Sequence, residues 1–405
     1  MAITGPLEGI RVADFTWVWA GPFCTLQLAH LGAEVIRVET ATRPCVTRML
    51  PPWADGEFGV NRSGYFNQYN QGKQSLTLDL KNPRAVELAK ELVAKSDIVC
   101  ENFAAGVMDR MGLGYSVLQQ VKPDIIMIAL SGYGATGPER EFVSYGPAQV
   151  PLSGMSSLTG YRDWPPMHVG ISYGDPTGGL HGAVAVLAAL LYRARTGRGQ
   201  FIDLSQQETT IAVIPDGVMD YTMNETQPLR QGNRSRQMAP HGIFRCTGEQ
   251  RWIAITVRDD DEWQRFAARI GHPKLANDPQ FRTLAARKAN EDRLEEIVTE
   301  WTLAHSPEDA TQILQDIGVP AFTTYSSKDL SQDLHLNAAN FFVNLEHPEV
   351  GARQHVGIPW RMSGTPCAVR HAAPCLGEHT DHVLVEILGY STDQVTALKN
   401  EGVVN

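Results

Sequence analysis

The stretch GIRVADFTWVWAGPFCTLQLAHLGAEVIRVE, residues 9–39, decides the fold of this chain. Its apolar run at 10–15 predicts a buried strand, the segment 22–31 that Gly-Pro opens predicts a helix, and 34–38 predicts a second strand. Gly32 stands where that helix ends. Strand, helix and strand in this order form a βαβ unit, which has parallel strands and a right-handed crossover.

The same alternation continues along the chain. Further strands are predicted at 75–80, 97–101 and 125–130, with a helix at 83–95. The pattern indicates an α/β protein with a doubly wound, open parallel sheet. Ligands bind such sheets beyond the carboxyl ends of the strands. We therefore expect the loops at 17–21, 39–48 and 102–106 to face a ligand.

The pattern changes near Asn224, which indicates a second domain. A hairpin is predicted at 242–257, followed by helices at 260–270, 286–303 and 306–317. We interpret 225–330 as a small α+β domain inserted between 1–224 and 331–405, which together form the large domain.

Composition excludes several classes of protein. The chain has 405 residues and a net charge of −10, which argues against a nucleic-acid partner. Its six cysteines are scattered without metal-ligand spacing, which favours reduced thiols in the cytoplasm and no metal site. The longest apolar run, 183–191, is too short to span a bilayer, and we expect no membrane association.

One motif is misleading. Residues 132–137, GYGATG, match the GxGxxG pattern of dinucleotide-binding loops. That fingerprint needs a helix opening inside the motif within the first βα unit, whereas Pro138 follows here. We interpret the segment as a structural turn.

Asp175 is the leading candidate for chemistry. It lies in the run GDPTGGLHG, residues 174–182, between a polar loop and the apolar helical pattern 183–194. An aspartate there is expected at a helix N-cap, where free backbone N–H groups favour a carboxylate. Its role is then either to cap the helix or to react.

Five further segments bear on that choice. They are PLEGIRV at 6–12, AGPF at 20–23, LGAEVIRVE at 31–39, TGRGQ at 196–200 and LGEHT at 376–380. Together with the Asp175 run, and in this order, they resemble the class III CoA-transferases, the family of formyl-CoA transferase and carnitine CoA-transferase. The resemblance implies a large domain built from both chain ends, an inserted small domain and an interlocked dimer.

The resemblance also implies the chemistry. Asp175 would attack an acyl-CoA thioester, forming first an aspartyl anhydride and then an aspartyl-CoA thioester. Coenzyme A and acyl-CoA are then substrates, with no permanently bound cofactor. Backbone N–H groups of the helix start, or of a loop between Gly232 and Gly242, are candidates to stabilise the oxyanions.

The family's contacts carry over unevenly. The CoA-contact positions correspond to Trp19, Ala20, Leu78, Lys81, Asn102, Phe103, Arg110 and Tyr145, and the substrate pocket to Trp17, Trp19 and Tyr145. Formyl-CoA transferase has His and Gln at the two tryptophan positions, an Arg at Thr40 and a Lys at Val143. The two tryptophans favour an aromatic or bulky acid over a very small one, or else belong to the core. The stretch TWVWAGPF resembles the benzylsuccinate CoA-transferase branch, which uses succinyl-CoA and pairs two homologous subunits.

Two alternatives stay open. A 2-methylacyl-CoA racemase would keep an aspartate near 175 but needs a histidine where Tyr145 stands. Because tyrosine is a poor base near neutral pH, this substitution favours the transferase. A non-catalytic partner subunit would have no need of Asp175. The identity of both acids, and the choice between a homodimer and a heteromer, are not determined by the sequence.

Overall fold

The computed structural model describes residues 5–404. The chain divides into two compact units, which are described separately. Among the described residues, the first unit comprises 5–156, 168–226 and 335–404, and the second comprises Ser157–Met167 and Gln227–Leu334. The predicted small domain at 225–330 thus overlaps the second unit, which also includes 157–167.

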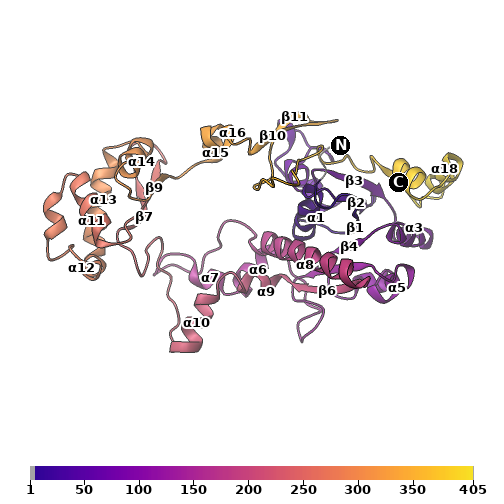
Figure 1. The fold of residues 1–405 in the computed structure, drawn as a ribbon, viewed down its shortest axis with the longest axis horizontal. Coiled ribbons are helices and arrows are strands. Elements are labelled where there is room, and N and C mark those ends of the chain that lie inside the picture. Colours follow the sequence, from indigo (N-terminus) through magenta and orange to yellow (C-terminus); the bar gives the residue numbers. More distant parts are fainter. Residues whose placement is uncertain (1–4, 405) are drawn as a thin grey trace. The chain divides into compact units, whose positions relative to one another are not determined.

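The first unit is built on one parallel sheet (Figure 1). Its strands are β1 Arg11–Asp14, β2 Glu34–Glu39, β3 Lys73–Thr77, β4 Ile98–Glu101, β5 Ile126–Ser131 and β6 Gln200–Ser205. Their order is β3-β2-β1-β4-β5-β6, and every neighbouring pair is parallel. The predicted doubly wound sheet is confirmed, although the sequence did not predict β6. The strand order reverses between β1 and β4, where such sheets hold ligands.

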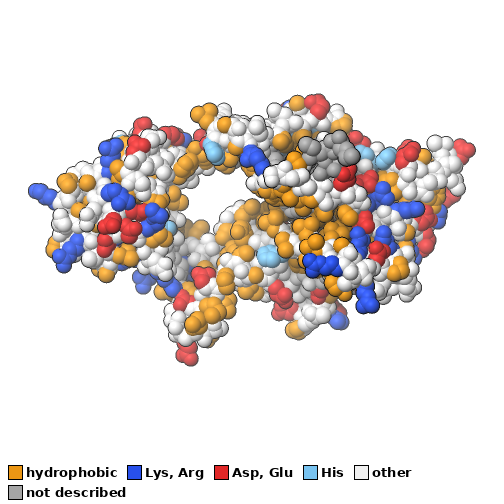
Figure 2. Space-filling model, in the orientation of Figure 1, with side chains coloured by type: hydrophobic (Ala, Val, Ile, Leu, Met, Phe, Trp, Pro, Cys, Tyr) orange, Lys and Arg blue, Asp and Glu red, His pale blue; other side chains and the backbone are white. Residues whose placement is uncertain are grey.

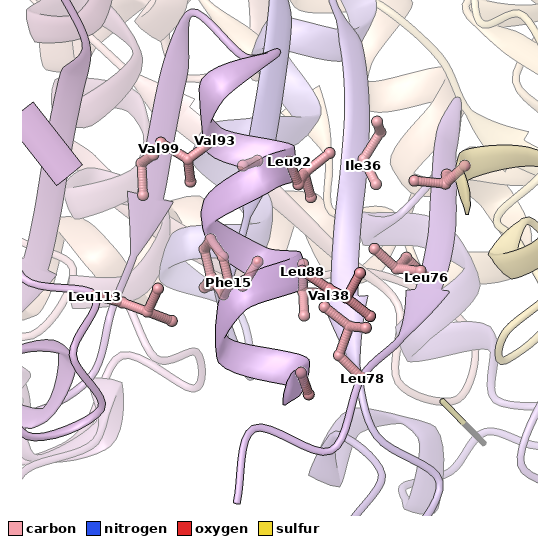
Figure 3. Close-up of a cluster of buried hydrophobic side chains, with 14 of the residues drawn as sticks. Phe15, Ile36, Val38, Leu76, Leu78, Leu88, Leu92, Val93, Val99 and Leu113 are labelled. Atoms are coloured by element: carbon pink, nitrogen blue, oxygen red, sulfur yellow. The ribbon is translucent and has the colours of Figure 1, made fainter. Parts of the chain in front are cut away.

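α3 covers one face of this sheet, and α1 and α8 cover the other. The helices before residue 225 are α1 Ala20–His30, α2 Gly64–Tyr69, α3 Pro83–Ala94, α4 Val107–Arg110, α5 Tyr115–Val121, α6 Gly146–Leu152, α7 Met155–Leu158, α8 Gly174–Thr196, α9 Gln206–Ile211 and α10 Pro215–Asn224, with 3-10 turns at Val46–Met49 and Ala54–Gly56. On one face, Leu88 and Leu92 of α3 lie beside Ile36, Val38 and Leu78 (Figure 3). Both leucines are fully buried, and truncating either to alanine should cost about 2–5 kcal/mol.

The opposite face is covered by α1 and α8. Cys24 and Leu28 of α1 and Val186 of α8 share a buried cluster with strand residues. At 23 residues, α8 is long and apolar enough to cross a membrane. Length and composition alone do not identify a membrane span, because core helices of soluble proteins pass the same test. Its outer side carries the exposed Val184 and Leu191, and Figure 2 shows hydrophobic side chains gathered over this region.

The C-terminal segment adds elements that the sequence did not predict. They are α16 Leu334–Ala338, the antiparallel pair β10 Phe342–His347 and β11 Gly351–Val356, α17 Thr380–His382, a π-helical turn Val383–Ile387 and α18 Thr392–Asn400. The LGEHT motif attaches this segment to β3. The Gly377 N–H donates to Ser75 Oγ at 3.0 Å, and the Thr77 N–H donates to Thr380 Oγ1 at 3.1 Å.

The second unit is a small α+β body. It contains β7 His241–Arg245, β8 Trp252–Thr256 and β9 Ala321–Thr323 in one sheet, α11 Asp260–Arg269, α12 Leu284–Ala289, α13 Glu291–Leu303, α14 Pro307–Gln315 and α15 Ser327–Gln332, with a 3-10 turn at Pro273–Asn277. The predicted hairpin is confirmed by β7 and β8. The single helix predicted at 286–303 is wrong, because Asn290 interrupts it. That side chain donates Nδ2 to the carbonyl oxygens of Ala286 and Gln280.

The GYGATG segment is a turn, as expected. It follows β5, and Gly134 and Gly137 both have φ of 85°. Because the next helix, α6, begins only at Gly146, no helix opens inside the motif.

Candidate active site

Asp175 lies in the first turn of α8, with its side chain buried to 6% exposure. The expectation that it caps its own helix is wrong, because Tyr173 occupies the N-cap. The carboxylate instead accepts the Ala20 N–H, the first N–H of α1, at 3.2 Å from Oδ1. Burial raises the pKa of Asp175 to about 7, and the Ala20 hydrogen bond opposes that rise. A buried carboxyl group whose pKa lies near 7 is typical of a functional site.

Two glycines make this close approach possible. A Cβ at Gly146 would lie 1.5 Å from Asp175 Oδ2, so no larger residue fits without moving the carboxylate. A Cβ at Gly179 would lie 2.8 Å from the Ala20 carbonyl oxygen, so this glycine lets α1 pack closely on α8. Gly179 therefore brings Ala20 within reach of Asp175, and Gly146 leaves room for the carboxylate.

A cavity of about 1110 Å³ opens beside Asp175. Of the site residues predicted from the sequence, those lining it are Asp175, Trp17, Leu78, Lys81, Asn102, Phe103, Arg110 and Tyr145. Residues of the three predicted loops also line it, among them Thr40 and Ala104. Trp19 and Ala20 do not line the cavity. The Ala20 N–H donates to Asp175, and the Trp19 ring packs on that of Tyr69.

The loops after β1 and β4 are joined across the point where the strand order reverses. The Trp17 N–H donates to Asn102 Oδ1 at 2.6 Å, and Asn102 Nδ2 donates to the Trp17 carbonyl oxygen at 2.8 Å. Phe103 lies 6.5 Å from the Trp17 ring. The mutual amide contacts hold Trp17 and Phe103 as two aromatic side chains of the same cavity.

Val18 separates the two tryptophans in an unusual backbone conformation. Its φ is 63°, which costs a β-branched residue on the order of 1–3 kcal/mol. Its N–H donates to the buried Cys45 Sγ at 3.3 Å. The strained turn helps to direct Trp17 to the cavity and Trp19 to the interior. Val18 and Cys45 both lie in loops that were expected to face a ligand, but their residue types did not indicate this role.

Positive side chains line the same cavity. Lys81 and Arg110 were predicted, and Arg43 and Arg140 join them. Arg43 lies over the Trp17 ring at 5.5 Å from its centroid. Such a set is suited to the phosphates of a nucleotide. Arg43 belongs to a loop that the sequence pointed to, whereas Arg140 had no such signal.

Glu101 is a buried acidic residue that sequence reasoning missed. Burial raises its pKa to about 8, the Phe103 N–H that it accepts at 2.7 Å opposes the rise, and Asp109 and Asp203 add to it.

Within residues 5–404, no group of three or more His, Cys, Asp or Glu side chains is placed to hold a metal ion.

Comparison with known proteins agrees with this architecture. Residues 7–380 match the profile of CoA-transferase family III. A succinyl-CoA–D-citramalate CoA-transferase of Chloroflexus aurantiacus is 32% identical, over 98% of each chain. A formyl-CoA:oxalate CoA-transferase of Bradyrhizobium sp. is also 32% identical, over 100% of this chain and 98% of the relative. The crystal structure of a CAIB/BAIF family protein from Brucella suis superposes with a TM-score of 0.87 at 30% identity, covering 95% of this chain and 100% of that one. With these matches over nearly its whole length, the chain belongs to CoA-transferase family III and is an enzyme of that family.

Proposed function

We propose that the enzyme moves CoA from an acyl-CoA donor to a carboxylic acid through covalent intermediates on Asp175. The observation that carries this proposal is the buried Asp175 carboxyl group, which borders the cavity and accepts the Ala20 N–H. Lys81, Arg110 and the Asn102–Phe103 pair would hold the nucleotide and pantetheine along the cavity.

The proposed steps exchange one bond at a time. An Asp175 oxygen attacks the thioester carbon of the donor, the C–S bond breaks, and CoA leaves as thiolate. The thiolate attacks the Asp175 carbon of the anhydride, and the donor acid leaves as carboxylate. The acceptor carboxylate then attacks the aspartyl-CoA thioester, which forms a second anhydride and releases CoA thiolate. The thiolate attacks the acceptor's acyl carbon in this anhydride, and the Asp175 carboxylate leaves. These reaction steps need no metal and no nucleotide triphosphate.

We propose that the donor is succinyl-CoA and the acceptor a bulky acid, in the manner of benzylsuccinate. A relative named for succinyl-CoA supports the donor, although an equally similar relative is named for formyl-CoA. Support for a bulky acceptor comes from Trp17 in the cavity and Trp19 near Asp175, where a very small acid would leave apolar surface uncovered.

We further propose an interlocked cytoplasmic dimer, formed with a second copy or with a homologous subunit. The exposed Leu180, Val184 and Leu191 on α8 support an interface on this helix. Light scattering of the chain alone, and after co-expression with a homologous subunit, distinguishes the two forms. A monomer in both preparations would contradict the dimer.

Racemase activity is less well supported. Proton transfer at an α-carbon needs a second base opposite Asp175. Among the described residues that line the cavity there is no histidine, and Tyr145 is 64% exposed.

Intact-mass analysis tests the covalent mechanism. With succinyl-CoA, the wild type should gain the mass of CoA less water, and hydroxylamine should remove the adduct and mark Asp175. Asp175→Asn, which keeps the oxygen that accepts the Ala20 N–H, should form no adduct and transfer no CoA. Transfer by the variant at a substantial rate would rule out the aspartyl route.

A further inference from the structure

Two charged side chains that contact the start of α1 are completely buried, and the proposed reaction does not use them. Asp14 ends β1 and Lys73 begins β3, and both are 0% exposed. Lys73 Nζ lies 3.4 Å from Asp14 Oδ2. A buried ion pair is weak evidence of a contribution to stability, because the loss of hydration offsets much of the attraction between the charges. The contacts of this pair are therefore a better guide to its role than its charges are.

Lys73 holds the first turn of α1. Its Nζ donates to the Pro22 carbonyl oxygen at 2.9 Å and to Thr25 Oγ1 at 2.8 Å. A third hydrogen bond, to Asn70 Oδ1 at 3.0 Å, joins the same ammonium group to the C-cap residue of α2. Lys73 therefore ties the start of α1 to β3 and to the end of α2.

Asp14 holds the residues on both sides of that turn. Its Oδ1 accepts the N–H and the hydroxyl group of Thr16, at 2.9 and 2.5 Å, and its Oδ2 accepts the Thr25 hydroxyl group at 2.7 Å. Thr16 in turn packs closely on the second residue of α1, because a Cβ added at Gly21 would lie 2.4 Å from Thr16 Cβ. Asp14 therefore fixes the start of α1 relative to β1.

The held turn carries the donor that meets the proposed nucleophile. Ala20 is the first residue of α1, and its N–H donates to Asp175 Oδ1 at 3.2 Å. This distance is at the long end of the range for an N–H···O hydrogen bond, so a small displacement of α1 weakens the bond. The bond opposes the rise in the pKa of Asp175 that burial causes. The position of α1 therefore affects how readily Asp175 loses its proton.

We infer that Asp14 and Lys73 are positioning residues, which hold the start of α1 where the Ala20 N–H meets Asp175. Both side chains are fully buried and lie outside the residues that line the cavity, so they act through α1 and not on the substrate. This inference rests on the proposed function, since it concerns the carboxylate that would attack the thioester.

Few neighbouring groups titrate in the range that the test needs. The charged and titratable groups around Lys73 are Asp14 on β1, Arg37 on β2, Cys24 and His30 on α1 and Cys100 on β4. Those around Asp175 are Tyr65 and Tyr69 of α2, and burial raises the pKa of each above its ordinary value of 10. Burial lowers the pKa of Lys73 to about 8, and Asp14 opposes that change.

The main test removes the pair as a unit. Asp14→Asn/Lys73→Met leaves no unpaired charge in the interior and keeps the net charge, so a change in the pKa of Asp175 reports position and not charge. Single-turnover formation of the enzyme–CoA adduct with succinyl-CoA is followed by intact mass from pH 5.5 to 8.5. The wild-type rate should rise with a midpoint near pH 7 as Asp175 loses its proton. The midpoint of the variant should lie about 0.5–1 pH unit higher, because the weakened hydrogen bond stabilises the carboxylate less.

A second variant and a control accompany it. Thr25→Val keeps the shape of the side chain and leaves Asp14 and Lys73 paired, but it removes the hydroxyl group that both bind. Its midpoint should move in the same direction by a smaller amount. Arg193→Met/Asp97→Asn is the matched control, because it removes an ion pair at the opposite end of α8 from Asp175. Its midpoint should equal that of the wild type.

Thermal melting shows which variants are folded. An unchanged midpoint in folded Asp14→Asn/Lys73→Met and Thr25→Val, or an equal shift in the control, would overturn the positioning role while the adduct still supported the aspartyl route. If the double variant does not fold, Thr25→Val decides between the two results. A wild type that forms no adduct at any pH would refute the aspartyl route, and this inference with it.

Discussion

Replacing Asp175 by Asn should stabilise the protein at the pH where the wild type works. The pKa of Asp175 is about 7 in the folded protein, against an ordinary value of 3.8, and burial is the main cause. Three pH units correspond to about 4 kcal/mol. Asn keeps the shape and the acceptor for the Ala20 N–H but carries no charge at any pH.

The sign follows from proton binding. Between pH 4 and 7 the folded chain holds a proton on Asp175 that the unfolded chain has lost, so stability falls as the pH rises. The stability that the neutral carboxyl group provides is complete below about pH 4 and is lost by about pH 7. Glu101, whose pKa is also raised, titrates in both proteins and cancels from their difference.

Urea denaturation of wild type and Asp175→Asn at matched protein concentration measures this difference. Asp175→Asn should be more stable by up to about 4 kcal/mol at pH 8, and the two proteins should converge near pH 4. The wild-type kcat/KM should rise between pH 6 and 8 as the carboxylate forms. A stability difference that is constant from pH 4 to 8 would refute a proton-holding, buried Asp175.

Two further predictions concern the cavity and its glycine. Arg110→Ala should weaken CoA binding by about 1–3 kcal/mol in low-salt calorimetry if the guanidinium meets a phosphate. Arg293→Ala, which changes an exposed arginine of the second unit, should leave the CoA affinity unchanged. Equal CoA affinities of the wild type and Arg110→Ala would place Arg110 outside the site. Gly146→Ala should displace the Asp175 carboxylate and lower kcat at least tenfold with little change in CoA affinity, while Gly364→Ala, whose added Cβ meets nothing within 4 Å, should leave both unchanged. Full activity in Gly146→Ala would show that the carboxylate is free to move.

The sequence predicted the sheet well because its signals are local. The apolar strands, the Gly-Pro helix start and the Gly32 stop in residues 9–39 each act over a few neighbouring residues. The C-terminal hairpin β10–β11 was missed because its alternation is weak, with Leu345 among its few buried apolar side chains. The break at Asn290 depends on a side-chain contact that periodicity does not encode.

The candidate site was only partly predictable, because local sequence patterns do not encode contacts between distant segments. Asp175, Asn102 and Arg110 lie in motifs, so a linear pattern sufficed to find them. The contacts of Trp19, which precedes α1, with Tyr65 and Tyr69 of α2 join segments that are separated in sequence and meet only in the folded chain. Glu101 could not be identified as perturbed, because burial causes its shift and burial is a property of the fold.

The fit between Gly146 and Asp175 limits how such an enzyme can diversify. A Cβ at position 146 would lie 1.5 Å from Asp175 Oδ2, so a larger residue there requires the carboxylate to move. Other positions near this carboxylate are 145, which lines the cavity, and 19, whose ring packs on Tyr69. A library for new acids should therefore keep residue 146 fixed and randomise these two.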